Sequence, residues 1–187
     1  MDWFRLKHTV ALYLIYSGTK RANYIKKHHL FHHVGDKCMF TFRKLPLYGD
    51  LISVGNNVRF ASNVLLVTHD AIHNMLNNMD PTLKLPEYTG CIEMGDNVFV
   101  GANTTILYNS YIPSDTIIGA GSLVNRRLTS GGVWAGVPVR YICSIEEFLA
   151  KRGRDYLKIE KNGHRLSEKT IQAAWDAYHA QTETKSD

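Results

Sequence analysis

The stretch MGDNVFVGANTTILYNSYIPSDTIIGAGSLV, residues 94–124, carries an aliphatic residue at every sixth position. These positions are Met94, Val100, Ile106, Ile112, Ile118 and Val124. A helix repeats its apolar residues about every 3.6 positions and a half-buried strand about every 2, so neither explains a period of six. Three such steps make one triangular turn of a parallel β-coil, in which one side chain per face points inward. The stretch therefore predicts a solenoid whose inward row is buried against the turns above and below.

The residues between the aliphatic positions agree with this interpretation. Small or β-branched residues stand two positions earlier, at Val98, Thr104, Ser110, Thr116 and Ser122. Gly, Asn and Asp fill the predicted corners, in Gly95-Asp96-Asn97, Gly101-Ala102-Asn103 and Gly119-Ala120-Gly121. Such residues suit tight turns because they adopt positive φ or hydrogen-bond to nearby backbone.

The repeat begins earlier in the chain and is interrupted twice. Its earlier members are Val34 and Phe40 in an opening turn, then Val54, Phe60 and Leu66. The phase slips by two residues between Phe40 and Val54, and Leu66 and Met94 are 28 residues apart, four more than a whole number of sixes. We therefore expect residues 71–91 to leave the coil as a loop directly after His69-Asp70. Excursions of that length usually serve a functional site.

Composition and charge narrow the class of protein. The chain has 187 residues, 44% of them hydrophobic, which suits one globular domain. No apolar run reaches the roughly 18 residues of a spanning helix, and residues 9–16 lack the cleavage site of a signal peptide. The three cysteines lie far apart, which favours free thiols in a reducing cytoplasm. Of the residues in 1–45, nine are Lys or Arg and two are Asp. This basic arm favours an anionic neighbour, although a solvated helical face is the simpler interpretation.

Four motifs together resemble the hexapeptide-repeat acyltransferases, nearest to the galactoside, maltose and surface-polysaccharide O-acetyltransferases. They are VTHD (67–70) before the expected loop, GDNVFVGAN (95–103), IIGAGSLV (117–124), and AGVP (135–138) followed by Arg140. The resemblance implies a mainly β fold, a left-handed parallel β-helix with N-terminal helices and a C-terminal helical cap. It also implies a homotrimer whose active sites lie between subunits.

The resemblance and the helical patterns suggest three segments. Residues 1–33 are expected to form a basic helical arm, with helices at 2–16 and about 19–30. Residues 34–142 form the coil with its extruded loop 71–91. Residues 143–187 form a helical extension, with a capping box at Ser144 and Glu147 and a second helix from Ser167.

Acetyl transfer from a thioester to a hydroxyl requires a base, and histidine is the side chain best matched to that role near pH 7. The resemblance implies that His69, the last coil residue before the loop, is this base. It also implies that the backbone N–H of Ala102 stabilises the oxyanion and that Phe99 forms an apolar wall. Asp70 is a candidate orienting partner for the imidazole. The alternative is that Asp70 hydrogen-bonds to backbone at the start of the loop.

The expected cosubstrate is acetyl-CoA, and the resemblance carries its contacts onto the later turns of the coil. The matching positions are Phe99, Ala102, Ala120, Gly121, Asn125, Arg126, Gly136, Val137, Pro138 and Arg140. Small turn residues permit close approach of the pantetheine, and the two arginines supply cations for phosphate. No metal is expected.

The acceptor is less defined. The resemblance points to a sugar hydroxyl of a surface polysaccharide or its precursor. Relatives acting on galactosides carry an Asn about one and a half turns before the histidine, whereas FTFRKLPLY (40–48) has none. N-acetylation of an amino sugar or small xenobiotic therefore stays open. Two other classes also remain: a carbonic anhydrase, which would need three metal-binding histidines where the coil offers His69, and a non-catalytic scaffold. Nucleic acid is not expected as a partner.

The basic arm contains KKHHLFHH, residues 26–33. His28/His32 and His29/His33 have a spacing that a metal can use on a helix, but exposure or contact with an anionic acceptor is the simpler interpretation. His73, four residues after His69, is either exposed or near the acceptor. With WFRLKHTVALYLIY (3–16) ahead of it, the arm could rest on an anionic membrane. The expected location is the cytoplasm, at the inner face of the membrane.

Overall fold

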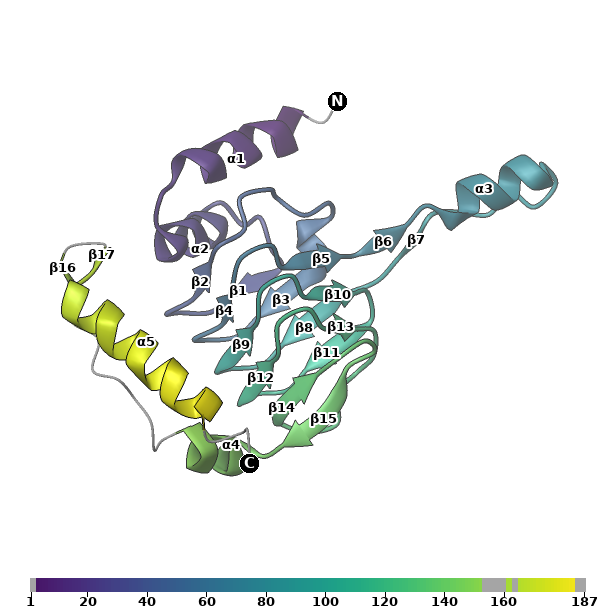
Figure 1. The fold of residues 1–187 in the computed structure, drawn as a ribbon. Helices are drawn as coiled ribbons and strands as arrows, with labels where there is room; N and C mark the ends of the chain where they lie inside the picture. Colours follow the sequence, from purple (N-terminus) through teal and green to yellow (C-terminus); the bar gives the residue numbers. More distant parts are fainter. Residues whose placement is uncertain (1–2, 153–160, 163–164, 184–187) are drawn as a thin grey trace. The chain divides into compact units, whose positions relative to one another are not determined.

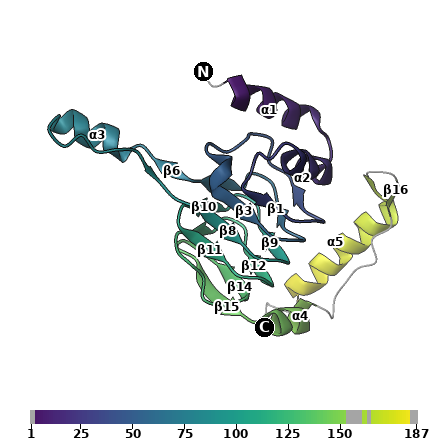
Figure 2. The ribbon, with the colours of Figure 1, turned by 180° about the vertical axis from the view of Figure 1, so that it is seen from behind.

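The computed structural model describes residues 3–152, 161–162 and 165–183. It contains a triangular coil of short strands, visible in Figure 1 and from behind in Figure 2. Its three faces are the sheets β1-β3-β8-β11, β13-β10-β5 and β15-β14-β12-β9-β4-β2. Neighbouring strands in these sheets are parallel, apart from the antiparallel pair β14 and β15.

The strands of the coil are two to four residues long, as a six-residue step with a corner requires. They are β1 (His33–Val34), β2 (Met39–Phe40), β3 (Ile52–Val54), β4 (Arg59–Phe60), β5 (Leu65–Val67), β8 (Ile92–Met94), β9 (Val98–Val100), β10 (Thr105–Leu107), β11 (Ser110–Ile112), β12 (Thr116–Ile118), β13 (Leu123–Val124), β14 (Gly132–Ala135) and β15 (Arg140–Cys143). Ile92 pairs with Ser110, eighteen residues later, so one turn of the coil takes three steps.

Two rows of side chains, rather than the single row expected, point into the coil on each face. The aliphatic row is buried throughout, and so are the residues two positions earlier. These earlier residues are Val98, Thr104, Ser110, Thr116 and Ser122. Alternate residues of a strand share one face, so both ends of strands such as β9, β11 and β12 face inward. The buried hydroxyls are satisfied by backbone carbonyls of the corners, for example Thr104 Oγ1 to Gly119 O at 3.1 Å.

The corners use Asn and Gly for different reasons. The non-glycine residues with positive φ include Asn57, Asn63, Asn97, Asn103, Asn109 and Asp115. The amide of Asn57 donates to Asn97 Oδ1 at 3.1 Å, and that of Asn97 donates to Asp115 Oδ1 at 2.8 Å, which forms a ladder along one edge. Gly101 instead provides room, because a Cβ there would stand 2.4 Å from the backbone N of Ala120. The predicted need for positive φ is thus met mainly by asparagine.

Two helices cover the opening turn of the coil. These are α1 (Trp3–Leu14) and α2 (Gly18–Lys27), with Ser17 as N-cap of the second. Ala22 and Ile25 of α2 are buried where this helix packs on β1 and β2. The Arg21 side chain is also buried and donates to the carbonyls of Phe40 at 2.9 Å, Ile15 at 2.6 Å and Tyr16 at 3.0 Å. A buried charge needs such partners.

The histidine-rich stretch differs from its prediction. Helix α2 ends at Lys27, and His29 has a φ of 51°, so His28/His32 and His29/His33 do not share a helix. All four side chains are exposed. The His28 ring packs on Tyr24, with centroids 4.3 Å apart. The helical spacing that suggested a metal site is therefore not formed.

Residues 68–90 leave the coil as an arm that projects into solvent in both views (Figure 1, Figure 2). It consists of β6 (His69–Asp70), α3 (Ile72–Met79) and β7 (Tyr88–Thr89), with β6 and β7 paired antiparallel. A short 3₁₀ helix, η1 (Gly49–Leu51), precedes β3. None of the side chains of α3 is buried.

The chain divides into two compact units at Ile145 and Glu146. The second unit contains most of α4 (Ile145–Arg152), the hairpin β16 (Lys161–Asn162) and β17 (Arg165–Leu166), and α5 (Glu168–Glu183). Ser167 Oγ accepts from Thr170 N at 3.2 Å, which starts α5 where the sequence predicted a helix.

No helix among the described residues is both long and apolar enough to span a bilayer.

Candidate active site

His69 stands at the point where the chain leaves the coil. It follows β5 and opens β6, where it pairs with Thr89 across the base of the arm. The side chain is half-buried. Its ring meets the Tyr48 ring edge-on, with centroids 5.3 Å apart. Tyr48 in turn donates to Glu87 Oε2 at 2.8 Å, and this hydrogen bond raises the pKa of the tyrosine hydroxyl.

One nitrogen of the His69 ring has no partner. Its Nδ1 is buried and makes no hydrogen bond with any residue that the structure describes. Buried polar atoms are nearly always paired, because leaving one unpaired loses its hydration without compensation. The Nδ1 of His73 on α3 is in the same condition. Both imidazoles thus present a buried nitrogen that a ligand or a second copy of the chain can satisfy.

Asp70 has partners other than His69. Its Oδ1 accepts from the backbone N–H of Ile72 at 3.1 Å, and its Oδ2 accepts from the Tyr108 hydroxyl at 2.8 Å. The hydrogen bond to the carboxylate raises the pKa of Tyr108. Neighbours on a strand face opposite sides, so Asp70 and His69 diverge. This geometry does not support Asp70 as the orienting partner. It agrees with the alternative, in which the carboxylate holds the start of the loop.

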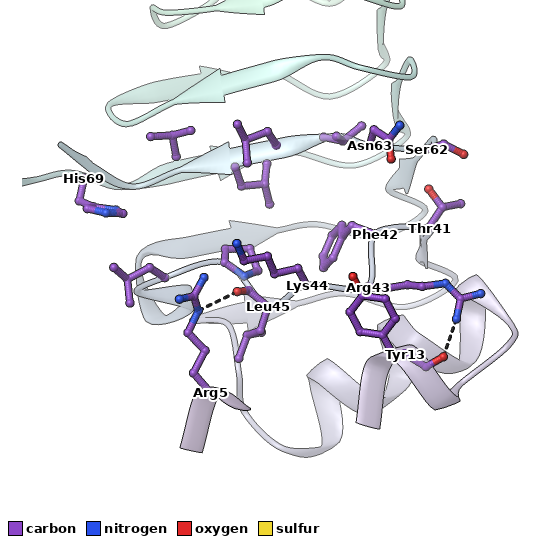
Figure 3. Close-up of a pocket in the computed structure, with 16 residues that line it drawn as sticks. Arg5, Tyr13, Thr41, Phe42, Arg43, Lys44, Leu45, Ser62, Asn63 and His69 are labelled. Carbon is purple, nitrogen blue, oxygen red and sulfur yellow. Dashed lines mark hydrogen bonds between the residues drawn. The ribbon is translucent and has the colours of Figure 1, made fainter. Parts of the chain in front are cut away.

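A cavity of about 560 Å³ lies beside His69 (Figure 3). It is bounded by α1, by residues 41–47 and by the stretch 62–69 that contains β5. Its apolar wall includes Phe42, Leu65 and Leu66, and its polar lining includes three basic side chains. The cavity therefore joins the predicted base to the FTFRKLPLY segment, which the sequence left without a role.

The turn residues expected to hold the coenzyme lie at one corner of the coil. Gly121 N donates to Ala102 O at 2.8 Å, and Leu123 N donates to Gly136 O at 3.0 Å. Gly121 and Gly136 have φ values of 69° and 102°, which L-residues with side chains rarely adopt. This corner therefore gathers the following predicted residues: Ala102, Ala120, Gly121, Gly136, Val137 and Pro138.

The other expected contacts are exposed on the coil surface. Phe99 is on β9, Asn125 and Arg126 follow β13, and Arg140 begins β15. Phe99 is 42% exposed, so it offers an apolar surface without a cover in a single chain. The Arg127 guanidinium lies over the Tyr111 ring, 4.8 Å from its centroid. Tyr111 belongs to β11, so Arg127 is directed toward the sheet β1-β3-β8-β11.

The predicted base and the predicted oxyanion donor do not meet within one chain. His69 follows β5, whereas Ala102 precedes β10, and these strands are adjacent and parallel. The two residues therefore lie at opposite ends of the same sheet, separated by at least a three-residue strand, roughly 10 Å. In a single chain, the predicted oxyanion donor therefore does not lie beside the predicted base.

Several residues around the site were not identified from the sequence. They are Tyr48 and Glu87 beside His69, Tyr108 on Asp70, and Arg5 and Lys44 in the cavity. They come from segments up to 103 positions apart, which follow no common spacing. The only signal was the basic excess of residues 1–45.

Comparison with known proteins identifies the family. The chain is 30% identical over 141 residues to YvoF, a protein of Bacillus subtilis (strain 168) named as a presumptive acetyltransferase, and the match covers 74% of each chain. The chain belongs to the hexapeptide-repeat acetyltransferases. Galactoside O-acetyltransferase of Escherichia coli (strain K12) is 31% identical over 116 residues, which are 62% of this chain and 55% of that enzyme. No family model matches the chain.

Solved structures support the same family assignment. A maltose O-acetyltransferase from Clostridium difficile 630 superposes with a TM-score of 0.55 at 25% identity, covering 76% of this chain and 84% of that one. The protein is therefore an acetyltransferase with the left-handed β-helix of this family. The predicted family, fold class and enzyme class are confirmed, and acetyl-CoA as cosubstrate agrees with them.

A second class of relative shares the coil. Gamma carbonic anhydrase 2 of Arabidopsis thaliana is 30% identical over 129 residues, which are 60% of this chain and 45% of that enzyme. Within the described part of the chain, no group of three or more His, Cys, Asp or Glu side chains is arranged to hold a metal ion. The acetyltransferase match covers more of both chains.

Proposed function

We propose that this protein is an acetyl-CoA-dependent O-acetyltransferase that modifies a hydroxyl of a sugar in a surface polysaccharide or its precursor. The observation that carries the proposal is the position of His69. Its half-buried ring lies on the wall of a cavity of about 560 Å³, at the junction of coil and arm, and its Nδ1 has no hydrogen-bond partner among the described residues. Ligand sites are commonly concave pockets of about 300–1,000 Å³ with a few convergent polar groups.

His69 acts as general base in this proposal. It accepts the proton of the acceptor hydroxyl while the oxygen attacks the acetyl carbonyl, and it then returns the proton to the departing sulfur. The backbone N–H of Ala102 on a neighbouring subunit stabilises the negative charge on the carbonyl oxygen. Both substrates meet in one groove, so no acyl-enzyme is needed.

The coenzyme is proposed to lie along the corner formed by Ala102, Gly121 and Gly136. Turns of small residues allow the pantetheine to approach the backbone closely. Phe99 supplies the apolar wall near the acetyl group. Arg126 and Arg140 are exposed cations on adjoining parts of the coil, suited to phosphate.

A homotrimer with sites between subunits is part of the proposal. One support is the separation of His69 from Ala102 by the length of β5. Another is the arm, whose apolar residues Ile72, Met75 and Met79 are all exposed, the last to 74%. Contiguous exposed apolar surface of this kind usually marks an interface. A neighbouring copy that covers the arm would bury it and complete the site.

We also propose cytoplasmic location at the inner face of the membrane, with α1 in contact with lipid. Trp3 is 74% and Leu14 81% exposed on α1, and Lys7 lies between them on the helix. An apolar helical face with adjacent basic residues suits an anionic bilayer surface. Co-sedimentation with anionic vesicles, compared with a variant lacking residues 1–18, tests this part; equal partitioning of both proteins would remove it.

The central test measures acetyl-CoA turnover with a panel of sugars. The rate is monitored through the free thiol of the CoA that each transfer releases. His69→Ala is expected to lower kcat by about 10²–10⁴-fold while the circular dichroism spectrum stays unchanged. His33→Ala, which removes an exposed histidine, is the matched control and should keep full activity. Wild-type rates in His69→Ala would refute the role of His69. Faster transfer to amino sugars than to their hydroxyl counterparts would favour N-acetylation.

A further inference from the structure

The cavity beside His69 is lined by several positive charges. Its basic side chains are Arg5, Arg43 and Lys44, and the described residues that line it include no Asp or Glu. These cations come from α1 and from the segment 41–47, so they are brought together only by folding. We call this space the cationic cavity.

The basic side chains hold different positions in the cationic cavity (Figure 3). Arg5 Nε donates to Leu45 O at 3.0 Å, which directs the guanidinium across the cavity floor. Arg43 Nη1 donates to Tyr13 O, toward the end farther from His69. Lys44 Nζ forms no ion pair or side-chain hydrogen bond with any described residue, and in Figure 3 Lys44 extends toward the same part of the cavity as Arg5.

A buried cation near Arg43 adds to the field. Arg21 is 4% exposed, and its side chain donates hydrogen bonds to the carbonyl oxygens of Phe40, Ile15 and Tyr16. Burial lowers the pKa of Arg21, and the positive charge of Arg43 lowers it further, which places the two guanidinium groups within electrostatic reach. Charges of one sign near low-dielectric walls concentrate the potential in a cleft.

We infer that the cationic cavity binds an anionic group of the acceptor, so that the substrate is a sugar carrying a phosphate ester or a carboxylate. This inference rests on the proposed function and names its substrate class. Lys44 and Arg5 hold the anion by charge-assisted hydrogen bonds, and Arg43 and Arg21 contribute through the field. Phe42 and Leu65 face the apolar surface of the sugar ring. The acceptor hydroxyl then lies at His69.

The test compares glucose, glucose 1-phosphate, UDP-glucose and glucuronate as acceptors in the full-length protein. Phosphate and carboxylate are thereby distinguished. The variants are Lys44→Gln, Lys44→Arg and, as matched control for loss of one charge, Lys27→Gln on the exposed end of α2. Loss of a charge-assisted hydrogen bond should raise KM for the anionic acceptor about tenfold in Lys44→Gln. Lys44→Arg and Lys27→Gln should stay within about twofold of wild type.

KM for acetyl-CoA should not change in Lys44→Gln. If it rises instead, the cavity serves the coenzyme phosphates and the inference is wrong. Equal KM values for glucose and the anionic sugars, or an unchanged KM for the anionic sugars in Lys44→Gln, would also overturn it.

A binding measurement separates this inference from the proposed function. Calorimetric titration of the His69→Ala protein with glucose 1-phosphate should show binding that weakens about tenfold when Lys44→Gln is added. Absence of that binding overturns the inference even if neutral sugars are acetylated. Binding without acetyl transfer from the wild-type protein to any acceptor supports the anion site and refutes the proposed reaction.

Discussion

Replacing Ile118 by Ala tests the stacked core of the coil against a control one residue away. Ile118 is fully buried on β12, where it is in register with Val100 on one side and Trp134 on the other. Ile117 precedes it on the same strand, is only partly buried and faces outward. The two variants remove the same atoms from the same backbone and differ only in the face of the sheet.

The expected loss for Ile118→Ala is about 4 kcal/mol in the free energy of unfolding. Deleting a buried Ile to Ala usually costs roughly 2–5 kcal/mol, and more where neighbours cannot move into the space. Here they are held by strand pairing on both sides, so the upper part of the range applies. Ile117→Ala should lower the free energy of unfolding by about 1 kcal/mol or less, because folding removes less of the apolar surface of this outward-facing side chain from water.

Urea unfolding followed by circular dichroism measures both losses, at one fixed protein concentration since the chain is proposed to form trimers. The midpoint should fall in Ile118→Ala without a change in slope. Equal losses in the two variants would refute the inward and outward assignment of β12, and with it the coil register on which the site geometry depends.

Two other changes probe the arm and the N-terminal helices. Tyr108→Phe removes the hydroxyl that donates to Asp70 Oδ2 at 2.8 Å, so cleavage of the arm by a low dose of protease should be several-fold faster while the coil keeps its melting temperature. Tyr111→Phe is the control, because the Tyr111 hydroxyl makes no hydrogen bond with any described residue. Identical cleavage in both variants would contradict the role of Asp70 as the arm's anchor. His8 is buried against Tyr24, with Nδ1 2.8 Å from its hydroxyl, and its pKa is lowered from 6.5 by burial, then by His28 and Lys7. The unfolded chain therefore binds a proton there at a higher pH than the folded chain does, so this contribution to stability is present above the unfolded pKa and is lost as pH falls through it toward the folded value. The melting temperature should decline less steeply between about pH 7.5 and 5.5 in His8→Gln than in the wild type; parallel curves would show that His8 is not the group responsible.

The sequence by itself determined the coil. The aliphatic residues at Val54 to Val124 recur with the step of the structure, and all of them are buried. The same arithmetic predicted that residues 71–91 leave the coil, and in the structure the excursion already includes His69 and Asp70, which form β6. Such features are readable because each side chain of a solenoid contacts residues one turn away, so a periodic interaction leaves a periodic sequence.

The tertiary structure decided what surrounds the histidine. The Asp70 carboxylate accepts a hydrogen bond from Tyr108, 38 residues later. The cationic cavity brings Arg5 of α1 together with Lys44 and β5. The KKHHLFHH stretch lost its helical spacing where α2 ended at Lys27. These outcomes depend on how non-repeating segments pack against the coil. Contacts between single residues at unrelated positions have no period, and only the folded chain brings them within reach of one another.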